Sequence, residues 1–224
     1  MPKRPEEYTP SPWGQEGLRE DLTYKQVRVP PAMVAALYQL QKDKAEVEYG
    51  GAVDFELVRG QPAVERILIY TGAKQRVSMA VWNKVFLNPD VELTFHTHPK
   101  QSIAIPSEGD IIFFLTTAAS AMLIIAGSQA LLLTKGTKTP PWKYALRELH
   151  KIEEIAGAIT PLFYDLSTAP RVQPEILEDL KSELDIDGVV FPAQQPIDVT
   201  VKVVQDVAKE GQRLAFFEWE LRRK

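Results

Sequence analysis

The sequence predicts a mixed α/β (α+β) fold, in which helices flank a central sheet and the chain continues at both ends as extensions. Two observations support this class. Short runs with alternating polarity are typical of strands, and longer runs carry apolar residues at helical spacing. The two kinds of run interleave along the chain, and interleaved elements usually pack helices against a sheet. The 224 residues suffice for one packed domain with extensions.

Hydrophobic periodicity and the proline and glycine breaks define the expected elements. The first half contains a helix over residues 32–44, strands over 51–58, 66–70 and 91–98, and a buried helix over 107–119. The second half contains strands over 121–125 and 130–134, one long helix over 141–159 and a short helix over 174–184. Two last strands, 197–204 and 213–221, would pair across a turn at 208–211.

Shifts in composition divide the chain into three parts. Residues 1–31 are rich in proline and charge, and we expect an arm that crosses the surface or stays mobile. Residues 32–160 contain the strongly patterned elements and form the expected main domain. Residues 161–224 are expected to be a C-terminal extension with a short helix and a possible hairpin.

Composition narrows the range of functions. The net charge of −4 argues against a nucleic-acid partner, because such proteins usually present a basic face. The chain has no cysteine, so disulfides and thiolate zinc sites are excluded and any metal must be held by His, Asp or Glu. We see neither a secretion signal nor an apolar run that would span a membrane, so we expect a soluble, cytoplasmic protein without a membrane partner. The oligomeric state stays open.

The most informative segment is FHTHPKQSIAIPSEGD, residues 95–110, which contains two of the three histidines. His96 and His98 are two apart on a predicted strand, so their side chains point to the same face. Asp110 lies in the first turn of the helix that begins at Ser107 and can fold back toward them. Two imidazoles and one carboxylate are a normal ligand set for catalytic zinc, with the fourth position left for water.

A zinc site that activates water also needs a nearby proton acceptor that does not bind the metal. Glu48 is the expected base, because it precedes a Tyr-Gly-Gly step where a helix gives way to a strand. The glycines allow the backbone to approach a substrate or a neighbouring strand closely. Glu48 would take a proton from the zinc-bound water and pass it to the leaving amine. Glu46 is the second choice for the base. The Ser107 hydroxyl could support the oxyanion.

A glutamate followed by His-x-His-Pro, seven residues and Ser-x-x-Asp resembles the signature of the JAMM (MPN+) zinc metalloproteases. The matching residues are His96, His98, Pro99, Ser107 and Asp110, and the resemblance covers about residues 32–135. It implies a JAB/MPN-like curved sheet and makes 32–160 the catalytic domain. It also implies zinc held by His96, His98 and Asp110, with Ser107 supporting the oxyanion. The implied activity is a deubiquitinase-like isopeptidase that cuts an isopeptide or peptide bond after the C-terminus of ubiquitin or a ubiquitin-like modifier.

Alternatives stay open at the level of substrate and of activity. The same chemistry could act on a sulfur-carrier precursor or another peptide, or the chain could be a non-catalytic MPN-type assembly scaffold. Each residue also has a structural interpretation. Ser107 and Asp110 match a helix capping box, and Glu48 alone would be an ordinary solvated glutamate. His150 is expected on a surface, and the Lys135–Lys138 turn is expected to be solvated. The aromatic residues Phe216, Phe217 and Trp219 are expected to pack in a core.

Overall fold

The computed structural model describes residues 22–29, 31–43, 48–58, 61–71, 93–98, 103–117, 119–140, 142–160, 169–194 and 199–206. Its strands are β1 (Leu22–Val29), β2 (Tyr49–Val58), β3 (Gln61–Thr71), β4 (Leu93–His98), β5 (Ala121–Ala126), β6 (Gln129–Lys135), β7 (Ile186–Pro192) and β8 (Val199–Asp206). Its helices are α1 (Pro31–Asp43), α3 (Glu108–Thr116), α4 (Trp142–Arg147), α5 (Leu149–Ile159) and α6 (Ala169–Leu184).

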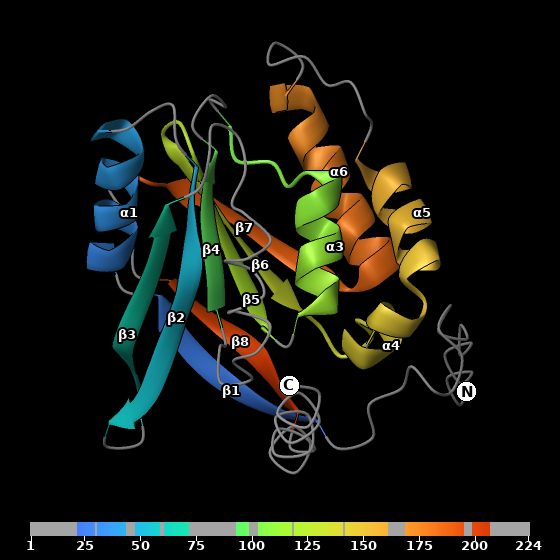
Figure 1. Ribbon diagram of the computed structural model, residues 1–224, viewed down its shortest axis with the longest axis horizontal. Coiled ribbons are helices and arrows are strands. Elements are labelled where there is room, and N and C mark those ends of the chain that lie inside the picture. The colour runs from blue at the N-terminus through green and yellow to red at the C-terminus, as the bar shows by residue number, and fades with distance from the viewer. Residues whose placement is uncertain are drawn as a thin grey trace, which may run out of the picture.

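Six strands form one mixed sheet in the order β3-β2-β4-β5-β6-β7. β4 and β5 run parallel, and the other neighbouring pairs in this sheet are antiparallel. β1 and β8 form a separate antiparallel pair, which crosses below the large sheet in Figure 1. The predicted mixed α+β class with helices around a sheet is therefore confirmed.

Helices cover both faces of the large sheet (Figure 1). α1 packs on one face, where Val34 and Leu37 meet alternate side chains of the central strands such as Phe95. The other four described helices lie on the opposite face and enclose a larger core that includes Ile111 and Phe114 of α3. β5 and β6 are buried along almost their whole length, which explains their continuous apolar sequences.

The connection from β4 to β5 determines where α3 begins. Two parallel neighbouring strands cannot be joined by a tight turn. The chain must leave the sheet at the end of the first strand and return to the end where that strand began, usually through a helix. Here α3 makes that crossover. Its first turn therefore lies beyond the C-terminal end of β4, where His98 is the last residue of the strand.

The helix predicted over residues 141–159 is interrupted in the structure. It consists of α4 and α5, which meet at Glu148, where φ is −102° and ψ is 37°. The two helices present different apolar faces: α5 buries Ile152, Ala156 and Ile159, whereas a continued stripe would run through Leu149, which is exposed. A break at Glu148 lets α5 turn its own apolar side toward the core.

The ends of the described chain also differ from the sequence-based expectation. Leu22–Val29, expected in an arm that crosses the surface or stays mobile, forms strand β1 and pairs with β8. The expected partner of β8, residues 213–221, lies outside the described residues. In the C-terminal part, the helix begins at Ala169 instead of residue 174, and β7 joins the main sheet beside β6. The β1–β8 and β6–β7 pairings join segments far apart in sequence. Local hydrophobic patterns therefore could not predict them.

Lys135 was expected in a solvated turn, and that expectation is wrong. Its side chain is 4% exposed, its Nζ donates to the Thr117 carbonyl at 2.7 Å, and it lies 4.7 Å from the centre of the Phe114 ring. The ammonium group thus sits at the C-terminal end of α3, where a positive charge is favourable. Among the described residues, no helix is long and apolar enough to cross a membrane.

A tight corner fixes α6 to β7. Asp185 adopts the left-handed conformation with φ of 52°, and its carbonyl accepts hydrogen bonds from the Gly136 amide at 2.7 Å and the Thr139 hydroxyl at 2.9 Å. Its carboxylate accepts from the Lys138 amide at 2.8 Å and from Lys181. The corner leaves no room for a side chain at Gly136, because an added Cβ would lie 2.6 Å from the Asp185 carbonyl oxygen.

We predict that Gly136→Ala lowers stability by about 1–3 kcal/mol, the usual cost of overpacking. Thermal unfolding should show the loss as a lower Tm. Gly157→Ala is the matched control: its Cβ would have no neighbour closer than 3.9 Å, and alanine favours a helix interior over glycine. The control should unfold at or above the wild-type temperature, and equal Tm values for all three proteins would contradict the crowding at Gly136.

Candidate metal centre

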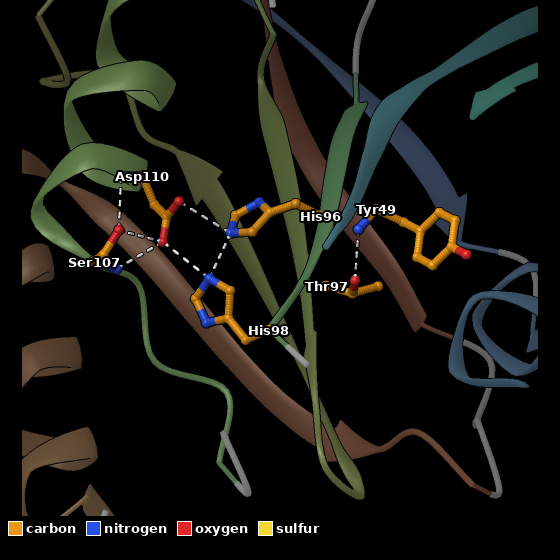
Figure 2. Close-up of polar contacts among 6 residues, drawn as sticks. All are labelled: Tyr49, His96, Thr97, His98, Ser107 and Asp110. Atoms are coloured by element: carbon orange, nitrogen blue, oxygen red, sulfur yellow. Dashed lines mark hydrogen bonds and ion pairs between the residues drawn. The ribbon is translucent and has the colours of Figure 1, made fainter. Parts of the chain in front are cut away.

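The three residues predicted to bind metal meet at one point, where the C-terminal end of β4 faces the first turn of α3 (Figure 2). His96 Nε2 lies 3.0 Å from His98 Nε2. The Asp110 carboxylate completes the group: its Oδ1 is 3.1 Å from His96 Nε2 and its Oδ2 is 3.3 Å from His98 Nε2. The histidine side chains are almost wholly buried, and Asp110 is 17% exposed.

These separations match a tetrahedral metal site. Zinc bonds to nitrogen and carboxylate oxygen measure about 2.0–2.2 Å, so neighbouring ligand atoms of a tetrahedral zinc lie about 3.3 Å apart. The three distances between ligand atoms, 3.0 to 3.3 Å, are close to that edge length. An ion at the centre would require little movement of the side chains.

Hydrogen bonds alone do not account for the same three contacts. Each imidazole Nε2 carries at most one hydrogen. If both carried one, two donors would face each other across 3.0 Å. If only one did, at least one of the two contacts with the Asp110 carboxylate would lack a donor. A cation that accepts lone pairs from all three groups resolves this conflict, so the residues present fit a metal ion.

Glu48 joins the group from the position just before the neighbouring strand β2. β2 pairs with β4 so that Gly50 lies opposite His96, and continuing this register places Glu48, two residues earlier, beside His98. Gly50 itself has no side chain, so no side chain from this position lies beside His96. Glu48 is 8% exposed, and its carboxylate and the two imidazoles all lie within 4.8 Å of one another. Glu48, His96 and His98 form a buried group that could hold a metal ion.

The electrostatics differ between the two carboxyl groups. Burial raises the pKa of the Glu48 carboxyl above its usual value. Positive charge on His96 and His98 opposes that rise, and the Asp110 carboxylate reinforces it. Burial would also raise the pKa of Asp110, but the charges and hydrogen bonds of the two imidazoles hold it well below its usual range. The Asp110 carboxyl group therefore favours its anionic form, whereas the Glu48 carboxyl group binds a proton more readily than an exposed glutamate does.

Ser107 holds Asp110 in place through the capping box that its sequence spacing predicted. The Ser107 amide and hydroxyl donate to Asp110 Oδ2 at 2.7 and 2.8 Å, and the Asp110 amide donates back to Ser107 Oγ at 3.2 Å. The hydroxyl hydrogen is thus directed at the carboxylate. The expected oxyanion role of Ser107 would require this hydrogen to turn toward a substrate.

Two supporting residues escaped the sequence reasoning. Thr97, between the two histidines, points to the other side of β4 (Figure 2), where its Oγ1 accepts a hydrogen bond from the Tyr49 amide at 2.9 Å. Gln41 of α1 donates to the carbonyl of His98 at 3.1 Å. Both are buried, and both fix the backbone on which the ligands stand. Only the alternation of β4 hinted at Thr97, and nothing in the sequence pointed to Gln41.

The remaining candidates lie elsewhere. His150, the third histidine of the chain, is 86% exposed and lies 3.6 Å from Glu154 on α5, as expected for a surface residue. Glu46, Phe216, Phe217 and Trp219 lie outside the described residues. No protein-family model matches the chain, and no curated protein matches its sequence.

Two imidazoles and one carboxylate bind zinc well, and the same set also suits non-haem iron. A metal held this way keeps positions open for water or substrate. The nearby Glu48 carboxylate provides a group that can exchange protons there. The arrangement is therefore suited to metal-assisted chemistry on a bound water.

We predict that the purified protein, dialysed after exposure to zinc, holds about one zinc per chain, because the three ligand atoms are already in place. His98→Ala should hold almost none. His150→Ala is the matched control and should bind as much zinc as wild type. The His150 side chain is exposed, and its ion-pair partner is Glu154 on α5. Plasma mass spectrometry gives the content and identity of the metal. A wild-type protein without metal, or a His98→Ala protein with a full load, would contradict the site.

Proposed function

We propose that this chain is a zinc-dependent hydrolase of the JAMM (MPN+) type that cuts an isopeptide or peptide bond after the C-terminus of ubiquitin or a ubiquitin-like modifier. The observation that carries the proposal is the convergence of His96, His98 and Asp110, at 3.0 to 3.3 Å, beside the buried carboxylate of Glu48. Hydrolysis by an activated water requires at least a bound metal and an adjacent base.

The arrangement of elements supports the same proposal. The glutamate precedes β2, the histidines end β4, and the Ser-x-x-Asp sequence opens α3, in the order that the JAMM resemblance implies. A six-stranded mixed sheet with helices on both faces is compatible with a JAB/MPN-like domain. The finer family assignment rests on the signature residues and their convergence.

Zinc bound to His96, His98 and Asp110 would supply a Lewis acid and make water acidic enough to react near neutral pH. Glu48 accepts the proton that the water loses as its oxygen attacks the carbonyl carbon. It then delivers that proton to the nitrogen of the leaving amine as the C–N bond breaks. The products are a carboxylate on one side and an amine on the other. Burial, which raises the pKa of Glu48, makes it a better proton acceptor than an exposed glutamate.

Ser107 has two parts in this scheme. It orients Asp110 in the resting state through two hydrogen bonds to Oδ2. During attack, its hydroxyl can turn to donate to the negative charge that develops on the carbonyl oxygen. The Ser107 amide still holds Oδ2 when the hydroxyl leaves it, so Asp110 keeps its place.

A scaffold function is the alternative from a different class. It predicts a protein that folds and binds partners without metal or cleavage. The three close ligand contacts and the buried glutamate favour the enzyme, because the helix cap accounts for Asp110 but not for Glu48, whose buried carboxyl group beside two imidazoles is costly without a cation.

We predict that Glu48→Gln abolishes cleavage while zinc content and Tm stay at wild-type values. Glutamine has the same shape but cannot accept the proton, and loss of a general base typically costs about 10²–10⁴ in rate. Glu183→Gln, an exposed position on α6, is the matched control and should keep full activity. Cleavage by Glu48→Gln at the wild-type rate would assign the base to another residue.

The substrate class is tested with isopeptide-linked conjugates of ubiquitin-like proteins on one side and short peptides with the same scissile bond on the other. A preference for the conjugates supports the isopeptidase. Equal rates on both, or activity on a sulfur-carrier precursor alone, support the same chemistry on a different substrate. Protein that holds no metal and cleaves none of them favours the scaffold.

A further inference from the structure

We propose that Gln129 and Gln173 form a clamp that positions Asp110 for metal binding, an inference that rests on the metal site of the proposed function. The two side chains come from distant parts of the chain, the start of β6 and the second turn of α6. They meet at Ala104, three residues before the serine that begins the Ser-x-x-Asp sequence. We call these two residues the glutamine clamp.

The clamp satisfies both backbone groups of Ala104. The amide of Gln173 donates from Nε2 to the Ala104 carbonyl at 2.6 Å, and the Ala104 amide donates to Gln129 Oε1 at 3.4 Å. The two side chains also bind each other, from Gln173 Nε2 to Gln129 Oε1 at 3.2 Å. Each contact supports the other two, so the clamp is a small closed network.

The backbone at Ala104 needs such partners. It lies between β4 and α3, outside any described helix or strand, so no regular ladder supplies its hydrogen bonds. Ala104 and Ile105 are fully buried, so bulk water does not reach these peptide groups. Buried peptide groups without partners are costly. Gln129 accepts from and Gln173 donates to the buried backbone at Ala104. The two glutamines therefore hold in place the linker between β4 and α3.

The position of the linker decides the position of Asp110. From Ala104 the chain reaches Ser107 in three residues, a span of about 10 Å when extended. Ser107 then holds the Asp110 carboxylate by its amide and hydroxyl. A shift of about 1 Å at the linker would pass into the Asp110 contacts with His96 and His98, and metal sites are sensitive to displacements of that size. The glutamines act through Ser107 and Asp110, so they are positioning residues.

The clamp also connects helix α6 to the site. α6 lies beyond residue 135, where the resemblance to the metalloprotease signature ends. Apolar contacts from Ile176 and Leu180 attach it to the same core as Ile105. Gln173 adds a directed polar contact on top of this packing. A helix without any ligand thereby determines the geometry of one.

The test is Gln173→Met in the full-length protein, because methionine keeps the length of the side chain and loses the donor. Arg171→Met, two residues away on the same helix and exposed, is the matched control. Zinc affinity measured by competition with a chromogenic chelator should fall about tenfold in Gln173→Met, the low end of the effect of outer-shell contacts. The visible spectrum of the cobalt-loaded protein should shift. Arg171→Met should match wild type in both.

Hydrogen exchange in the metal-free protein gives a second readout. The amides of Asp110 and Ile111, bonded to Ser107 Oγ and the Ser107 carbonyl, should exchange faster in Gln173→Met than in wild type. Gln129→Met should change zinc affinity and hydrogen exchange in the same direction as Gln173→Met. The double variant should lose less zinc-binding free energy than the two single variants lose together, because the two residues share contacts.

Three results would overturn the inference. Unchanged zinc affinity and an unchanged cobalt spectrum in Gln173→Met would refute it. So would a lower Tm with unchanged zinc affinity, since the glutamine would then have a structural role alone. If wild type binds neither metal, the proposed function fails on its own account. Hydrogen exchange in the metal-free protein then tests the clamp separately. Unchanged protection of the Asp110 amide in Gln173→Met would refute the clamp as well.

Discussion

The parallel pairing of β4 with β5 is the constraint on which the site depends. A parallel neighbour requires a crossover, and here the crossover is α3, which must begin beyond the end of β4. The last residues of the strand and the first turn of the helix therefore face each other. The antiparallel pairing of β2 on the other side of β4 brings Glu48 to the same place. The strand order of the sheet thus brings three segments of the chain together at one end of β4.

Local chemistry made a large part of this arrangement predictable. The alternation of β4 placed His96 and His98 on one face, and the serine-to-aspartate spacing gave both the start of α3 and its capping box, which the structure confirms. Most of the predicted strands and helices exist, with boundaries that differ by a few residues. These features depend on periodicities of a few residues, so a single sequence contains enough information for them.

Other features depend on long-range pairing and were not predictable. The pairing of β1 with β8 and the addition of β7 beside β6 are decided by which edges remain available after the central strands assemble. The break at Glu148 and the burial of Lys135 depend on helix directions in the finished core. The neutral polar residues that support the site, such as Gln41 and Gln173, have no pattern in the sequence, since a glutamine in a helix is ordinary until its partner is known.

The shared use of Asp110 Oδ2 has a consequence for how such a chain could evolve. The same oxygen that faces His98 also accepts both hydrogen bonds of the helix cap, so a lineage that stopped using the metal would still be under selection to keep Ser107 and Asp110 for the start of α3. Neither histidine takes part in the helix cap, and apolar residues would suit a buried strand at least as well. Retention of His96 and His98, rather than of the serine and aspartate, therefore separates a lineage that uses the metal from one that has kept only the fold.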